Sequence, residues 1–127
     1  MCTPSYDPLY LDGIRHFNQH DFFEAHESWE ELWTEYQGPL RRFYQGLIQV
    51  AVCLHHFGNG NMHGTRKLYT SSVGYLEHYL PHCEGIDLVT FVASFQSCCQ
   101  AVLEQEAPLE RVDLPVHLIP RIELQSP

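Results

Sequence analysis

The sequence lacks any apolar run close to the roughly 18 residues that a membrane-spanning helix needs, so we expect no transmembrane segment. It also lacks an apolar signal region in residues 1–7, and we therefore expect a cytoplasmic protein. Five cysteines, an odd number without C-x-x-C spacing, argue against a disulfide scaffold or a zinc knuckle. The length of 127 residues is typical of one domain, so we predict a single helical domain over residues 1–127.

Basic residues are scarce, with 7 Lys and Arg against 16 Asp and Glu and a formal net charge of −9. Because an acidic surface repels phosphate groups, we do not expect nucleic acid as a partner. A metal cation or a basic partner is electrostatically easier to bind. A solvated acidic surface explains the same charge without any partner.

Apolar residues recur at helical spacing in five segments, which predicts an all-α fold. Glycine and proline residues separate the segments. We predict helices over residues 9–19, 21–36, 39–57, 61–80 and 87–106. The third is apolar on nearly all sides, so it should be the central helix. Asp21 and Glu24 have capping-box spacing at the start of the second helix.

A shift of forty residues aligns the second predicted helix with the fourth, so that Trp29 falls on Tyr69. This internal similarity predicts two tetratricopeptide-like hairpins, although a chance likeness between amphipathic helices explains it equally well. The expected architecture is a five-helix antiparallel bundle of helical hairpins. Four prolines then predict an extended C-terminal tail over about residues 107–127: Pro108, Pro115, Pro120 and Pro127.

The second predicted helix carries an unusual number of acids without a single Lys or Arg. Like charges at i,i+3 and i,i+4 cost a few tenths of a kcal/mol per pair. A cation, or arginines from another element, should therefore offset them. The acids are Asp21, Glu24, Glu27, Glu30, Glu31 and Glu35.

His26 and Glu30 are four residues apart, on the shoulder of this helix beside its apolar face. The spacing suits chelation of a divalent metal and equally suits a hydrogen bond. A metal would need a third ligand, for which Glu27, His20 and His56 are the candidates. The alternatives are a structural hydrogen-bond network and acid–base catalysis, with His26 as the base oriented by Glu30.

The few polar positions inside the third predicted helix form one stripe, made by Gln45, Gln49 and His56 with Arg42 at its edge. A tight hairpin would place Gln45 level with Glu30 and Gln49 level with His26. Buried polar groups must be paired, so these residues should bond to one another or to a bound molecule. The predicted ligand pocket comprises Gln45, Gln49, Trp33, Arg42 and His56.

The segment His26-Glu-Ser-Trp-Glu30-Glu-Leu-Trp33 matches the signature H-x-x-x-E-x-x-W. With Gly38-Pro39-x-Arg41 and Gln45-Gly46-Leu47-Ile48-Gln49, the chain resembles the bacterial and archaeal domain of unknown function 309 over about residues 14–80. Thr65 stands where alanine is expected. The resemblance implies a helical fold and a metal-binding role for the signature, with no assigned reaction.

Two functional hypotheses follow. The first is a metal- or ligand-binding protein, with a site formed by His26, Glu30, Glu27 and the pocket residues. The second is a helical-hairpin module that binds a peptide or a partner helix, in which His26 and Glu30 form a purely structural network. A homodimer is compatible with both, and we assign no enzymatic activity.

Overall fold

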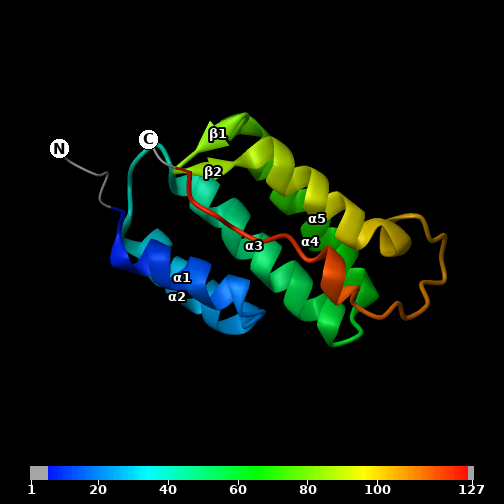
Figure 1. Cartoon of the computed structure of the whole chain (residues 1–127). Helices are drawn as coiled ribbons and strands as arrows, with labels where there is room; N and C mark the ends of the chain where they lie inside the picture. Colours follow the sequence, from blue (N-terminus) through cyan, green and yellow to red (C-terminus); the bar gives the residue numbers. More distant parts are fainter. Residues whose placement is uncertain (1–5, 126–127) are drawn as a thin grey trace.

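The computed structural model describes residues 6–125 and shows helices packed as antiparallel hairpins (Figure 1). Each of the first four helices packs mainly against its neighbours in the chain, and α5 packs against α4. The predicted all-α class is confirmed. The helices are α1 (Pro8–Asn18), α2 (Phe22–Glu35), α3 (Arg41–Gly58), α4 (Met62–Leu76) and α5 (Leu88–Leu103).

The short elements between and after the helices were not predicted. A 3-10 helix, η1 (Glu77–Tyr79), ends the α4 segment, and a second one, η2 (Val116–Leu118), lies in the tail. Two antiparallel strands, β1 (His82–Cys83) and β2 (Ile86–Asp87), pair across a turn that contains Gly85 at φ +78. Strands of two residues leave no readable alternation in a sequence.

Helix α3 is the central element, as its composition predicts. It packs against α2 on one side and α4 on the other, and the C-terminal tail crosses in front of it in Figure 1. Its apolar residues are almost entirely removed from solvent. The fully buried ones are Phe43, Leu47, Val50, Ala51, Cys53 and Leu54.

The turn from α1 to α2 and the turn from α3 to α4 have the same backbone geometry. His20 adopts φ 65 in the first turn and Gly60 adopts φ 80 in the second, forty residues later. Both turns form the same pair of hydrogen bonds back to the preceding helix, a Schellman arrangement. The bonds are His20 N–Phe17 O, Asp21 N–His16 O, Gly60 N–Phe57 O and Asn61 N–His56 O.

The internal similarity at a spacing of forty residues thus corresponds to the same turn geometry after α1 and after α3. The tetratricopeptide-like character of the hairpins stays a prediction. The two turns differ in their caps. The side chain of Asn61 accepts from Gly64 N at 2.9 Å, whereas that of Asp21 makes no cap hydrogen bond. The predicted capping box at Asp21 is therefore wrong. Its carboxylate lies 4.0 Å from His16 Nδ1 instead.

No helix within residues 6–125 is long and apolar enough to cross a membrane.

Gly13 lies where α1 and α2 approach most closely. The indole ring of Trp29 fills the space that a Cβ atom at this position would occupy. Trp29 is fully buried, and its Nε1–H donates to Tyr10 O at 3.1 Å. The glycine is therefore required by packing, although it weakens the helical pattern of the sequence.

We predict that Gly13→Ala lowers the free energy of unfolding by about 1–3 kcal/mol, because the added methyl overlaps a rigid buried ring. Gly74→Ala is the matched control, since a Cβ atom there meets nothing within 4 Å. In the interior of α4 the control should raise stability by about 0.5–1 kcal/mol. Urea denaturation measures both changes. Equal effects of the two substitutions would contradict the close α1–α2 contact.

Candidate functional site

His26 and Glu30 form a close pair on α2. His26 Nε2 lies 2.6 Å from Glu30 Oε2, and His26 Nδ1 lies 3.2 Å from Phe23 O. The two side chains are 22% and 52% exposed, respectively. The pair thus lies at the surface rather than inside a dry interface, and both ring nitrogens already face an oxygen atom.

These residues do not fit a metal ion. Within the described part of the chain, no three His, Cys, Asp or Glu side chains lie together so as to hold one. Glu27 is exposed on α2, and His20 lies in the α1–α2 turn. The third-ligand candidates therefore do not complete the His26–Glu30 pair, and a metal at either imidazole nitrogen would displace an existing contact.

Next to this pair, α2 and α3 enclose a small pocket. Glu30 and Trp33 come from α2 and lie one turn apart, and Gln45, Ile48 and Gln49 come from successive turns of α3. The pocket has a volume of about 180 Å³. The structure therefore brings together Glu30, Trp33, Gln45 and Gln49, four of the residues singled out in the sequence.

Two polar atoms of the pocket-lining residues lack a partner. Within the described residues, Trp33 Nε1 and Gln49 Oε1 are buried and accept or donate no hydrogen bond. By contrast, the indole nitrogen of Trp29, the other tryptophan, donates a hydrogen bond to Tyr10 O. Buried polar groups are nearly always paired, and each unpaired one costs about 1–3 kcal/mol. One unpaired donor and one unpaired acceptor thus belong to side chains that line the same pocket.

Arg41, at the start of α3, fixes the other side of Trp33. Its guanidinium carbon lies 4.0 Å from the centre of the Trp33 ring, a cation–π contact. It also donates to the carbonyl groups of Trp33 and Tyr36, the latter at 2.8 Å. Sequence reasoning missed this role and chose Arg42. The Gly38-Pro39-x-Arg41 turn was the available signal.

Arg42 and His56, which were also assigned to the pocket, are not among the residues that line it. Arg42 lines a different hollow, between α3 and α4, with Tyr75 and His78. His56 lies at the α3–α4 turn, with Nδ1 3.3 Å from Asn61 Nδ2, and burial followed by the neighbouring His55 lowers its pKa. Both side chains lie beside α4 and its N-cap instead.

The hydrogen bonds expected from Gln45 and Gln49 of α3 to residues of α2 are not formed among the described residues. Among the described residues, neither Gln45 nor Gln49 bonds to His26 or Glu30. Glu30 lines the pocket, whereas His26 contacts the Glu30 carboxylate and does not line the pocket itself. The side-chain oxygen of Gln49 is therefore left without a hydrogen bond between α2 and α3 within the described residues.

We predict that Glu30→Ala costs only about 0.3–0.5 kcal/mol more stability than Glu31→Ala, the value of an exposed i,i+4 pair. The reason is that the Glu30 side chain is 52% exposed, so its loss leaves no deeply buried charge. Denaturation midpoints of the two variants provide the comparison. A difference of about 2 kcal/mol would show that the carboxylate is buried, as the sequence pattern alone suggests.

Comparisons with known proteins agree with the resemblance noted in the sequence. The chain is 31% identical over 115 residues to the "Uncharacterized protein YpuF" of Bacillus subtilis (strain 168), covering 87% of this chain and 66% of that protein. It is 41% identical over 46 residues to an "Uncharacterized protein" of Aquifex aeolicus (strain VF5), covering 35% of this chain and 14% of that protein. The chain thus spans slightly less than two thirds of the first relative and a small part of the second.

Neither relative's name carries an activity. Residues 10–68, from within α1 to within α4, match the family model described as "Domain of unknown function (DUF309)". This range contains every residue that lines the α2–α3 pocket. Within this segment, the chain is similar to the DUF309 family.

Proposed function

We propose that the protein binds a small organic molecule in the pocket between α2 and α3. The observation that carries this proposal is the unpaired donor on Trp33 and the unpaired acceptor on Gln49, in side chains that line one pocket. A ligand with both a donor and an acceptor would satisfy the two atoms at once. We assign binding, and no reaction, to this pocket.

The lining groups favour a ligand with N–H donors. The Glu30 carboxylate and Gln49 Oε1 accept hydrogen bonds, and the formal net charge of −9 favours a cation over an anion. Trp33 Nε1 can only donate, so the ligand also needs one acceptor atom. Amides meet both conditions, and amines or guanidines meet them only when the rest of the ligand carries an acceptor atom.

The size of the pocket limits the ligand further. A volume of about 180 Å³ is smaller than the roughly 300–1,000 Å³ of sites for drug-sized ligands. Ile48 supplies an apolar side, which suits a short aliphatic portion of the ligand. A compound of a few heavy atoms, or the end of a longer one, fits this space.

Two residues outside the pocket hold its walls in position. His26 contacts the Glu30 carboxylate at 2.6 Å, and Arg41 lies over the Trp33 ring at 4.0 Å. Both contacts restrict side chains that the ligand would touch. They act as positioning residues, since neither lines the pocket.

We predict that millimolar acetamide, formamide or glycinamide, which carry both N–H donors and a carbonyl acceptor, shifts the indole N–H signal of Trp33 in a ¹H–¹⁵N spectrum. The signal of Trp29 is the internal control, because its nitrogen is paired with Tyr10 O and fully buried. For at least one probe the Trp33 shift should saturate while Trp29 stays unchanged. The two tryptophans of the chain make the assignment direct.

Variants then test the lining residues. Glu30→Gln and Gln49→Leu should weaken binding of the responsive probe by about tenfold or more, because hydrogen bonds to charged or buried groups contribute about 1.5–3 kcal/mol. Glu31→Gln is the matched control on the exposed side of α2 and should bind as the unaltered protein does. An unmoved Trp33 signal with all three probes, or equal losses in the control, contradicts the proposal.

A further inference from the structure

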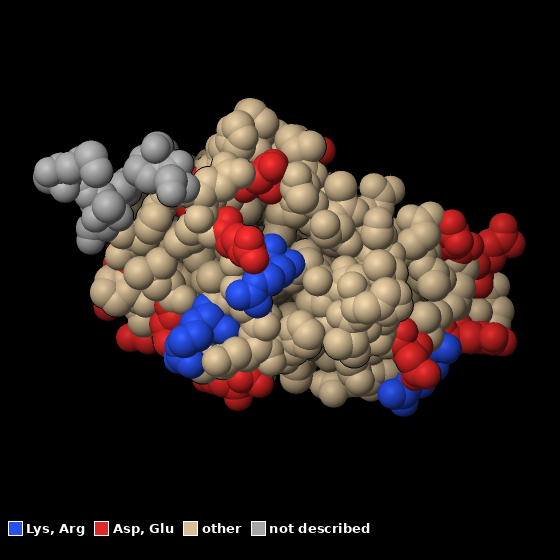
Figure 2. Space-filling view, in the orientation of Figure 1, with Lys and Arg blue, Asp and Glu red and all other residues tan. Residues whose placement is uncertain are grey.

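Most basic side chains of this acidic protein lie beside an acidic side chain or a carbonyl group. Arg15 pairs with Asp12 at 2.6 Å, and Arg111 lies 3.8 Å from Asp113. On the face seen in Figure 2, the Lys and Arg side chains, in blue, lie next to Asp and Glu side chains, in red. With 7 basic against 16 acidic residues, an arginine without such a partner is unexpected.

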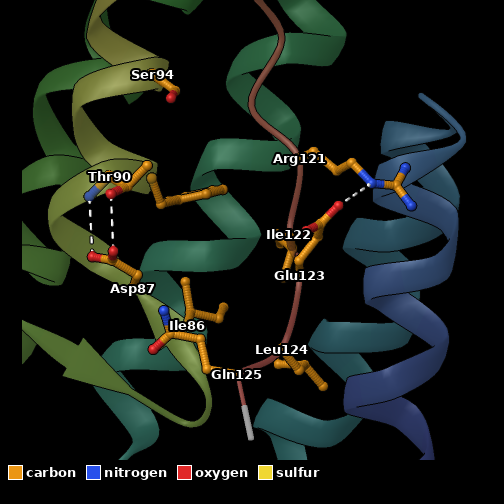
Figure 3. Close-up of a pocket in the computed structure, with 10 residues that line it drawn as sticks. Ile86, Asp87, Thr90, Ser94, Arg121, Ile122, Glu123, Leu124 and Gln125 are labelled. Carbon is orange, nitrogen blue, oxygen red and sulfur yellow. Dashed lines mark hydrogen bonds and ion pairs between the residues drawn. The ribbon is translucent and has the colours of Figure 1, made fainter.

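Arg121, in the C-terminal tail, illustrates the usual arrangement. Its Nε lies 3.1 Å from Glu123 Oε1 (Figure 3). In the same view, the carboxylate of Asp87 accepts from Thr90 N at 3.2 Å and from Thr90 Oγ1 at 2.9 Å. The hollow between the tail and α5 is thus lined by one arginine and two carboxylates, so its charge does not favour an anion.

Arg42, in the first turn of α3, departs from this arrangement. Within the described part of the chain, it forms no ion pair with a carboxylate. Its neighbour Arg41, by contrast, is held by the carbonyl groups of Trp33 and Tyr36. Arg42 is exposed, so its positive charge is accessible to a ligand.

The side chain of Arg42 lines a hollow of about 260 Å³ between α3 and α4, which is separate from the pocket between α2 and α3. Ser71 and Tyr75 are one helical turn apart, and His78 follows three residues later, so these residues lie on one face of the α4 segment. The residues that line the hollow on this side are Ser71, Gly74, Tyr75 and His78.

The polar side chains that line this hollow can all donate a hydrogen bond, and none of these described residues carries a carboxylate. Arg42 offers a planar fork of N–H groups, which matches the oxygen atoms of a phosphate or carboxylate group. The hydroxyl groups of Ser71 and Tyr75 and the imidazole of His78 add donors from the second helix. The hollow therefore favours an anion, although the chain as a whole is acidic.

The hydroxyl group of Ser71 is free to serve such a ligand. On either side of it, Thr70 and Ser72 donate to carbonyl groups within α4 at 3.3 and 3.0 Å. Among residues 6–125, the Ser71 and Tyr75 hydroxyls make no bond of this kind. Neither group must leave a partner within the chain in order to contact a ligand.

We propose that the hollow between α3 and α4 binds the phosphate group of a small molecule, with the Arg42 guanidinium as its main contact. A tetrahedral phosphate presents acceptor oxygens in several directions, as donors from two helices require. Gly74 leaves room for it, because a Cβ atom at this position meets nothing within 4 Å. One arginine suits a single phosphate group rather than the extended backbone of a nucleic acid.

The test is a titration of the full chain with inorganic phosphate at constant ionic strength, followed by the amide signals of Ser71 and Tyr75 in a ¹H–¹⁵N spectrum. The unaltered protein should show a saturable shift. Arg42→Gln should weaken binding at least tenfold, because it removes the permanent positive charge of the hollow. Lys67→Gln is the matched control, since it removes an equal charge from an exposed position of α4 outside the hollow, and it should change the affinity less than twofold.

A second variant keeps the test decisive if Arg42→Gln disturbs the fold. Gly74→Leu places a side chain in the hollow without a clash at Cβ, and leucine favours a helix more than glycine does, so this variant should fold and not bind phosphate. A shift that does not saturate, undiminished binding by Gly74→Leu, or an equal loss in Lys67→Gln overturns the site. Acetate should bind at least fivefold more weakly, and equal binding of acetate overturns the assignment to phosphate.

Discussion

Helix α3 must be covered on most sides, because nearly its whole circumference is apolar. The hairpin turns place α2 and α4 beside it, and Leu76 of α4 comes so close that a Cβ atom at Gly46 would lie 2.9 Å from its Cδ2. The face left open is crossed by the extended tail. The arrangement of the remaining elements can thus be understood as the covering of one apolar helix.

The same constraint explains where the candidate pocket lies. Gln45 and Gln49 interrupt the apolar surface of α3 on the side that faces α2. Two amides cannot pack as tightly as apolar side chains without partners for their polar atoms. The result is a hollow at the α2–α3 seam, with Glu30 at its edge and the Trp33 indole in its wall.

Regular elements were predictable because helical periodicity and breakers act locally. Gly38, Pro39, Gly60 and Pro81 all lie within three residues of the end of an α-helix or a 3-10 helix. The position of Glu30 in one pocket with Gln45 and Gln49 could also be anticipated, since a short turn fixes which residues of the two helices face each other. The burial of Glu30 could not be anticipated. The sequence suggested a partly dry position beside the apolar face, whereas the Glu30 side chain is half exposed.

Features that depend on rotation or on distant contacts were missed. The sequence pattern began the third helix at Pro39, but α3 begins at Arg41. Arg41 is therefore the first residue of α3, and its side chain contacts Trp33. The path of the tail depends on the bonds between Asn18 and Ile122, which are 104 residues apart in the chain. An extended segment has no helical period from which such a register could be read.

A crystal structure of the protein that resolves ordered water would test the central claim most directly. This claim is that Trp33 Nε1 and Gln49 Oε1 need a partner from outside the chain. We predict a water molecule or another small molecule in the α2–α3 pocket within hydrogen-bonding distance of both atoms. A direct hydrogen bond between Trp33 Nε1 and Gln49 Oε1, with the pocket closed, would contradict it.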